Sequence, residues 1–179
     1  MYVGGLAAVL EPAASVVAAT ALAASRRSLL VVDPNVREDR GLESERTLKR
    51  LRALCEEADV LKASDEDIAR LWSDREPKAS CSRLARGGRL VVMTRGARGS
   101  TAYALAHEPV SVPAARVKLV NTIGAGDAFM AGMLTWLAAH AWRLDQPAGQ
   151  TAAMLAYASR VAGSVCAHSG TEPSTSHRL

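Results

Sequence analysis

Aromatic residues and paired cysteines are both scarce in this sequence. Aromatic side chains make up 4% of the chain, with a single phenylalanine, which excludes a base-stacking surface for single-stranded nucleic acid. The three cysteines, Cys55, Cys81 and Cys166, have neither an even count nor the paired spacing of a metal site. We therefore expect free, buried thiols in a reducing cytoplasm and no disulfide framework.

Long apolar runs and histidine clusters are missing as well. The N-terminal stretch is apolar, but no basic segment opens it and Glu11-Pro12 interrupts it, which argues against a signal peptide. The uncharged stretch that follows Glu11 is too short to span a bilayer. The four histidines have no metal-ligand spacing. We expect a cytoplasmic protein that binds neither a membrane nor nucleic acid.

The composition is that of a globular domain. A chain of 179 residues with 49% hydrophobic and 22% charged residues is long enough for one domain with a substantial core, and short for two. The net charge of +4 comes from scattered lysines and arginines. This distribution is a weak indication of anionic ligands and not the footprint of a nucleic-acid surface.

Short apolar runs alternate with helical patterns along the chain. Strands are predicted at residues 29–32, 59–63 and 89–94, helices at 12–27, 43–57 and 65–72. A hairpin is predicted at 100–112, followed by helices at 126–140 and 147–168. This alternation predicts an α/β fold with a mostly parallel sheet, in which ligands bind where strands end. Three segments follow strand ends: DPNVR at 33–37, KASDED at 62–67 and TRGARG at 94–99.

The stretch TIGAGDAFMAGM, residues 122–133, places one carboxylate, Asp127, in the first turn of an apolar helix. The start of a helix carries unpaired N–H groups and the positive end of the dipole, and we expect this one to be partly desolvated. Glycines at 124 and 126 leave those N–H groups open to a phosphate, at a cost of roughly 1 kcal/mol each against alanine. Asp127 would then accept a proton from an attacking hydroxyl, which requires it to face a crevice.

A purely structural explanation of residues 122–133 is the alternative to the catalytic one. An acidic residue in the first turn is favoured by the helix dipole, and glycine-rich turns precede many helices. The pattern is not a P-loop, because no Lys-Ser/Thr follows the glycines. It is not a Rossmann fingerprint either, because Phe129 stands at the third glycine position.

The stretch VNTIGAGDAFMAG resembles the C-terminal signature of the PfkB-type carbohydrate kinases of the ribokinase-like family, D-T-x-G-A-G-D-x-F-x-x-G, at every specified position except the first. The upstream blocks GGLAAVLEPAA, VVDPNVR, ADVLKASDEDIARLW and VVMTRGARGS look like those of bacterial fructokinases, in the same order. The resemblance covers essentially the whole chain. It implies the C-terminal portion of a ribokinase-like fold, with a mostly parallel three-layer α/β/α sheet that is truncated at its N-terminus.

The resemblance also implies a site and its ligands. Asp127 would be the catalytic base, and the N–H groups of Gly124, Ala125 and Gly126 the anion hole for the phosphoryl group. ATP, sugar and Mg²⁺ would be the ligands. The other implied contacts are Thr94, Gly96 and Gly99 for the nucleotide phosphates, Gly163 and Ser169 beside the adenine, and Asn35 and Arg37 for the phosphates or the sugar. From the residues alone, Arg37 could equally be an ordinary loop arginine, and Thr94 with its glycines a plain turn.

Two positions depart from the family pattern. Ser64 and Asp67 stand at the magnesium-linked Asn-x-x-Glu site, where the shorter Asp67 would act through water and Ser64 would lie near the nucleotide. The alternative is a helix start with Ser64 as N-cap and Asp67 at the capping-box position. Asn121 replaces the aspartate that in relatives helps to hold a monovalent cation, which implies a weakened potassium site.

The resemblance implies that an N-terminal half is missing, with most sugar contacts and the strands that would cover one sheet edge. We therefore expect little sugar kinase activity from this chain alone, because substrate positioning accounts for several kcal/mol of barrier lowering. Two hypotheses result. The first is a kinase that phosphorylates fructose or a related sugar. The second is an inactive nucleotide-binding remnant, or a fragment that joins a separately encoded N-terminal half or another copy of itself.

Overall fold

The computed structural model describes residues 1–36 and 44–169 of the chain. The chain divides into two compact units. Unit 1 is Met1–Thr94 with Tyr103–Leu105, and unit 2 is Arg95–Ala102 with Ala106–Leu179. Each is described by itself, and the count of one domain stays a prediction. Arg37 lies outside the described residues.

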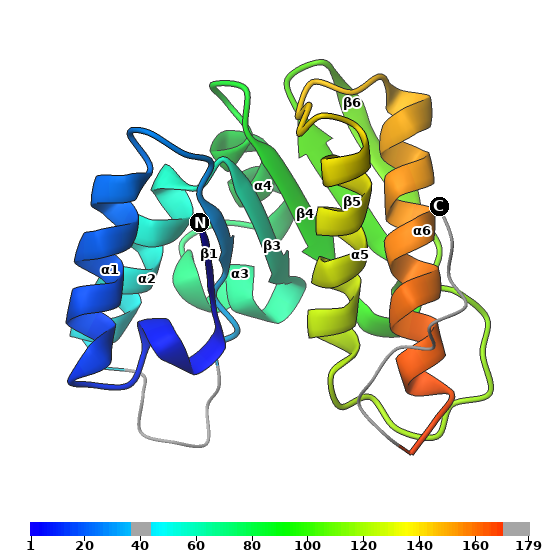
Figure 1. Ribbon diagram of the computed structural model, residues 1–179, viewed down its shortest axis with the longest axis horizontal. Helices are drawn as coiled ribbons and strands as arrows, with labels where there is room; N and C mark the ends of the chain where they lie inside the picture. Colours follow the sequence, from blue (N-terminus) through cyan, green and yellow to red (C-terminus); the bar gives the residue numbers. More distant parts are fainter. Residues whose placement is uncertain (37–43, 170–179) are drawn as a thin grey trace. The chain divides into compact units, whose positions relative to one another are not determined.

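Strands and helices alternate through unit 1 (Figure 1). Its elements are β1 (Tyr2–Gly4), the 3₁₀ turn η1 (Gly5–Ala8), α1 (Ala13–Ala24), β2 (Val31–Asp33), α2 (Glu45–Glu57), β3 (Val60–Ser64), α3 (Asp65–Leu71), α4 (Pro77–Leu84) and β4 (Leu90–Thr94). The rest of the chain forms the 3₁₀ turn η3 (Gly96–Arg98), β5 (Ser100–Ala104), β6 (His107–Val112), α5 (Ala125–Ala139) and α6 (Ala148–Cys166).

The six strands form one sheet in chain order, and β1 to β4 are parallel. The register aligns Val3 with Val32, Val32 with Leu61, and Leu61 with Val91. These four side chains form a buried apolar row across four strands, each at most 3% exposed. The predicted α/β fold with a mostly parallel sheet is confirmed.

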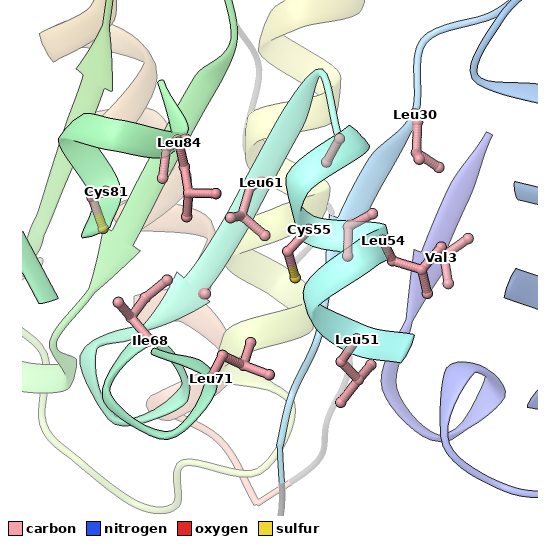
Figure 2. Packing of buried hydrophobic residues seen from close by; sticks show 14 of the residues in the cluster. Val3, Leu30, Leu51, Leu54, Cys55, Leu61, Ile68, Leu71, Cys81 and Leu84 are labelled. Carbon is pink, nitrogen blue, oxygen red and sulfur yellow. The ribbon is translucent and has the colours of Figure 1, made fainter. Parts of the chain in front are cut away.

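Helices α1 to α4 supply the other side of this core. Figure 2 shows the buried residues of α2, α3 and α4. In α2, Leu51, Leu54 and Cys55 are buried at helical spacing. In α3 the buried apolar residues are Ile68 and Leu71, and each is fully buried. Burying a leucine or isoleucine side chain stabilises the fold by about 1.5–3 kcal/mol relative to exposure. The face of the sheet that carries Val32 and Leu61 therefore packs against these helices.

The prediction of free, buried thiols is confirmed for Cys55 and Cys81 and is wrong in its burial for Cys166. Cys55 and Cys81 are free and buried, and Cys166 is free and half-buried. Burial raises the pKa of Cys81 to about 12. Burial, together with the nearby carboxylates of Asp67 and Asp33, raises the pKa of Cys55 well above its usual value. Both buried thiols stay protonated and unreactive at neutral pH.

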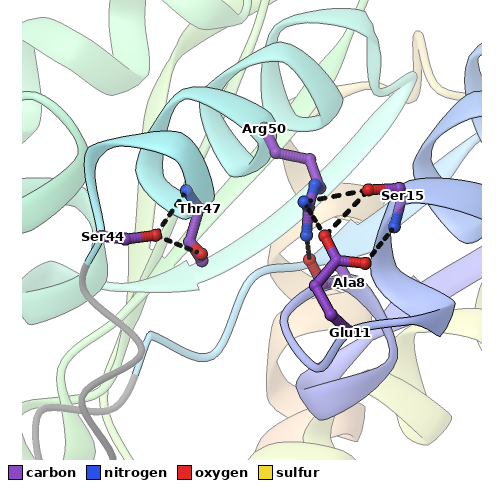
Figure 3. Close-up of polar contacts among 6 residues, drawn as sticks. All are labelled: Ala8, Glu11, Ser15, Ser44, Thr47 and Arg50. Carbon is purple, nitrogen blue, oxygen red and sulfur yellow. Dashed lines mark hydrogen bonds and ion pairs between the residues drawn. The ribbon is translucent and has the colours of Figure 1, made fainter.

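An arginine of α2 holds the loop that precedes α1 (Figure 3). Arg50 forms an ion pair with Glu11 and donates hydrogen bonds to Ala8 O at 3.4 Å and Ser15 Oγ at 3.2 Å. The Ser15 hydroxyl also donates to Glu11 at 2.8 Å, and this hydrogen bond is the largest cause of the lowered pKa of Glu11. The nearby start of α2 is capped by Ser44, whose Oγ accepts the Thr47 N–H at 3.2 Å.

A buried ion pair lies on the other face of the sheet in unit 1. Lys62 Nζ is 2.6 Å from Asp33 Oδ2, and the two side chains are only 7% and 3% exposed. Side chains alternate between faces along a strand, so Asp33 and Lys62 point away from the side of Val32 and Leu61. Asp33 ends β2, so the pair lies near the carboxyl ends of the strands.

In unit 2, α5 packs closely against α6. A Cβ at Gly132 would lie 2.8 Å from Ala158 Cα, so the two backbones touch at this point. Trp136 stacks on His140, with ring centroids 4.3 Å apart, and its Nε1 donates to Gln146 Oε1 at 3.1 Å. One face of α5 is buried, with Phe129, Met133 and Leu137 among its residues, whereas Ala131 and Thr135 are exposed.

The sequence patterns missed two elements. β1 has three residues, too few for an alternating pattern, and α4 is a polar helix that begins at Pro77. All the strands and helices that were predicted are present, and their observed ends differ from the predicted ends by up to three residues. No helix among residues 1–36 and 44–169 is long and apolar enough to cross a membrane.

The contact at Gly132 leads to a prediction for two helical glycines. Gly132→Ala should lower the free energy of unfolding by about 1–3 kcal/mol, because the added methyl group would collide with the α6 backbone. Gly149→Ala is the matched control, because a Cβ there meets nothing within 4 Å. It should raise stability by up to about 1 kcal/mol through helix propensity. Urea denaturation of both variants distinguishes the effects, and equal shifts would contradict close packing at Gly132.

The buried pair leads to a second prediction. Lys62→Met should lower the free energy of unfolding by about 3–5 kcal/mol, because it removes the ammonium partner of the buried Asp33 carboxylate. Lys78→Met, at an exposed position of α4, should change it by less than about 0.5 kcal/mol. The double variant Lys62→Met/Asp33→Leu should recover much of the loss in the same denaturation experiment. A loss for Lys62→Met no larger than that of the control would show that the pair carries little energy.

Candidate functional site

The turn before α5 has a left-handed backbone conformation at position 124, which favours glycine. Gly124 has φ +80° and ψ −4°, the values of the third residue of a type II turn. The Ala125 N–H closes this turn on Thr122 O at 3.2 Å, and the Ala128 N–H begins the helix on Gly124 O at 2.9 Å. A side chain at position 124 would strain this left-handed conformation, so the turn itself explains the first glycine of GAGD.

The predicted anion hole at Gly124, Ala125 and Gly126 stays a prediction, and the structure shows which N–H groups at this helix start are already bonded. The Ala125 N–H is used within the turn, whereas the N–H groups of Gly126 and Asp127 lie in the first helical turn and have no intrahelical acceptor. Gly124 and Ala125 are half-buried, and Gly126 and Asp127 are exposed. The expected partial desolvation of this helix start therefore holds for Gly124 and Ala125 and not for Gly126 and Asp127. The two N–H groups without an acceptor in the helix are thus those of Gly126 and Asp127, which come directly after Gly124 and Ala125 in the chain.

Asp127 is exposed and makes no hydrogen bond or ion pair with a described residue. It does not cap the helix through its side chain, because no side-chain cap bond is present at this end. Structural use of this carboxylate is thus limited to its charge near the positive end of the helix dipole. A catalytic role requires Asp127 to face a crevice, whereas in the described chain its side chain is exposed.

Asn121 ties this turn to the end of α6. Its Nδ2 donates to His168 O at 2.5 Å, and its Oδ1 accepts the Ile123 N–H at 2.9 Å. The N–H groups of Val120 and Asn121 also donate to Cys166 O, at 2.8 and 3.3 Å. These bonds satisfy carbonyl groups that the C-terminus of a helix leaves without partners. The amide of Asn121 thus has structural partners on both sides, and a role in cation binding stays a prediction.

Gly163 has a packing role that the sequence did not reveal. It is buried, and a Cβ there would lie 3.1 Å from Val117 Cγ1 and 3.2 Å from Ala115 Cβ. The Ala115 N–H also donates to Ser159 Oγ at 2.8 Å, so this segment runs along α6. Ser169 is exposed just beyond α6. Adenine contacts at Gly163 and Ser169 stay predictions.

The glycines of TRGARG shape a tight turn after β4. Gly96 and Gly99 have φ +54° and +84°, and a Cβ at Gly99 would lie 2.1 Å from Val112 O. The Gly99 N–H donates to Gly96 O at 3.0 Å, and the Arg95 N–H to Gly99 O at 2.8 Å. The plain-turn alternative therefore accounts for both glycines. Their contact with nucleotide phosphates stays a prediction, and the Gly99 N–H is already bonded.

Unit 1 brings the remaining predicted residues to the carboxyl ends of its strands. Ser64 and Thr94 are aligned neighbours at the ends of β3 and β4. Ser64 and Asp67 form the capping box of α3: Ser64 Oγ accepts the Asp67 N–H at 3.0 Å, and Asp67 Oδ2 accepts the Ser64 N–H at 2.9 Å. The capping alternative is confirmed. Asn35, at φ +42°, follows β2 in a left-handed conformation that asparagine tolerates.

Sequence reasoning missed Asp33, Lys62 and Arg70, which hold the segment after β2. Lys62 pairs with Asp33, and Arg70 donates to Val36 O at 3.0 Å. The available signals were a lysine inside an apolar strand and an arginine one helical turn after Asp67. Among residues 1–36 and 44–169, no group of three or more His, Cys, Asp or Glu side chains could hold a metal ion.

Comparison with curated proteins finds fructokinases. The chain is 36% identical over 116 residues to the fructokinase of Rhizobium leguminosarum bv. trifolii, which covers 64% of this chain and 35% of that protein. It is 30% identical over 168 residues to probable fructokinase-5 of Arabidopsis thaliana, which covers 92% of this chain and 51% of that protein. The chain thus spans about half the length, or less, of the curated relatives it matches.

Comparison with solved structures finds the same fold. The structure of a double-mutant fructokinase from Vibrio cholerae, bound to fructose, ADP and a potassium ion, superimposes with a TM-score of 0.81 at 23% identity. The match covers 95% of this chain and 55% of that one, so the fold is ribokinase-like. The family model for the pfkB family carbohydrate kinases matches residues 1–178. From this match and from its signature around Asp127, the chain belongs to the pfkB family of carbohydrate kinases.

Proposed function

We propose that this chain carries the phosphoryl-transfer half of an ATP-dependent sugar kinase. The acceptor is a hydroxyl group of fructose or a related sugar. The observation that carries the proposal is the start of α5, where a left-handed Gly124 opens a helix with free N–H groups beside an exposed carboxylate. Family membership and the fructokinase relatives support the reaction class, and the fructose and ADP in the Vibrio cholerae structure support the two substrates.

In the proposed reaction each group at this helix start has one role. The carboxylate of Asp127 accepts the proton of the sugar hydroxyl while the hydroxyl oxygen forms a bond to the γ-phosphorus of ATP. The bond from that phosphorus to the bridging oxygen breaks, and ADP leaves. The N–H groups of Gly126 and Asp127 and the helix dipole stabilise the charge on the transferring phosphoryl oxygens.

The proposal requires Asp127 to be covered during transfer. In the chain by itself this side chain is exposed. The bound substrates cover it in part, and we assign the rest to polypeptide equivalent to the portion of the relatives that this chain does not match. Exclusion of water strengthens the electrostatic contribution of the helix start, because the effective dielectric constant falls.

We expect Mg²⁺ to bind as a complex with the nucleotide. This ion keeps several waters and binds phosphate oxygens with one or two carboxylates, and so needs no dedicated protein cage. The described residues do not form such a cage, and the oxygens of Asp67 already accept two backbone N–H groups. We therefore assign no step of the reaction to a metal held by Asp67.

The base assignment is tested with Asp127→Asn. Transfer of labelled phosphate from MgATP to fructose should fall by about 10²–10⁴-fold, because the amide cannot take the proton. The affinity for MgATP, measured by calorimetry, should change by less than about threefold, because the backbone N–H groups remain. Asp145→Asn is the control, since it removes an exposed carboxylate of the same unit, one that pairs with Arg143.

Two outcomes would contradict the proposal. If Asp127→Asn and Asp145→Asn left transfer equally unchanged, Asp127 would not be the base. If the wild-type chain bound MgATP but transferred no label even in a sensitive assay, the chain would be a nucleotide-binding fragment, the second hypothesis from the sequence.

Asn121 leads to a prediction on monovalent cations. Replacement of potassium chloride by choline chloride at equal ionic strength should change MgATP affinity by less than about twofold, because a neutral amide already bonded to Ile123 and His168 offers a weak cation site. Calorimetry in the two salts measures this. A gain of about tenfold or more in potassium would show that the site is built without the carboxylate.

A further inference from the structure

Helix α3 holds one residue of the segment after β2 from both sides. The Val36 N–H donates to Asp67 Oδ1 at 2.8 Å, and Arg70 Nη1 donates to Val36 O at 3.0 Å. Asp67 and Arg70 are three residues apart in a helix, so their side chains lie on one face. Both polar groups of a single loop residue are therefore fixed by one helix.

Asp67 also joins this loop to the end of the next strand. While Oδ1 accepts Val36, Oδ2 accepts the Ser64 N–H at 2.9 Å. The side chain is 7% exposed, so these two hydrogen bonds to a carboxylate are shielded from water. A helix cap alone explains the bond to Ser64 but neither the bond from Val36 nor the contact of Arg70.

The other end of the segment is fixed by the buried ion pair. Asp33, the last residue of β2, is 2.6 Å from Lys62 of β3. Between Asp33 and Val36 lie Pro34, with its restricted φ, and Asn35 at φ +42°. Asn35 is thus held in a left-handed conformation between two anchored residues.

We propose that Asp67 and Arg70 are positioning residues that fix Asn35 at the carboxyl end of β2. In this role Asp67 acts on the loop and not on a metal ion. The inference rests on the proposed function in so far as Asn35 contacts a substrate of the transfer reaction. The anchoring itself rests only on the contacts within unit 1.

The anchoring is tested by amide hydrogen exchange, measured by NMR on the full chain. In Arg70→Ala the Val36 N–H should exchange about tenfold faster or more, because the residue is released on its carbonyl side. Arg70→Lys should restore most of the protection, because an ammonium can still donate to the carbonyl. Arg75→Ala is the matched control, since Arg75 pairs with its exposed neighbour Asp74. The Leu61 N–H, in the centre of β3, reports global opening and should be unaffected.

A second experiment separates positioning from metal binding. Asp67→Asn and Arg70→Ala should both lower the rate of phosphate transfer to fructose, and Arg70→Lys should recover it. The Mg²⁺ concentration that gives half-maximal transfer should be the same in all three variants and in the wild type. A shift of that midpoint in Asp67→Asn alone would show a metal role for Asp67 and overturn the inference.

The two failures are distinguishable. Unchanged exchange at Val36 in Arg70→Ala overturns the anchoring, whatever the activity. Faster exchange together with unchanged transfer overturns the link to function but leaves the anchoring. If the wild-type chain transfers no phosphate, the proposed function fails for this chain, and the exchange experiment still decides whether α3 anchors the segment.

Discussion

Backbone N–H groups at the ends of strands and helices need acceptors, and in this chain side-chain oxygens supply many of them. Asp59 accepts the Leu30 N–H at 2.7 Å just before β2, and Asp67 accepts one N–H from each of two segments. Asn121 and Ser159 do the same in unit 2. A buried N–H without a partner costs free energy comparable to a lost hydrogen bond. The loops at the ends of these strands and helices are therefore held by a few short polar side chains.

Several residues that were predicted to form the site also have a structural role. Ser64 and Asp67 form a complete capping box, and Gly124 and Gly99 are required by backbone conformation. Such local uses do not exclude a functional role, because a residue that shapes a loop also decides where its N–H groups point. Asp127 differs from the others. It has no structural partner among the described residues, so its only structural contribution is its charge near the helix dipole.

Local patterns were sufficient to predict most of the fold. The apolar run before Asp33, the Ser-x-x-Asp start of α3 and the glycine turn before α5 each depend on neighbouring residues, and each is present. The contacts of Arg70 with Val36 and of Lys62 with Asp33 join residues about 30 positions apart, by way of parallel pairing that a local pattern does not contain. The sequence did not reveal that Gly126 and Asp127 are exposed, because exposure depends on what covers a helix end and not on the residues of the helix.

The close approach at Gly132 and the bonds of Asn121 together form a closed ring. The ring runs from the turn at Gly124 through α5 to Ala158, along α6 to His168, and back through Asn121. A ring closed by backbone contact at one point and by hydrogen bonds at another restricts the turn before any ligand arrives. The conformational entropy of that turn is thus lost during folding, so the anion binding that we propose for this helix start would begin from an ordered turn.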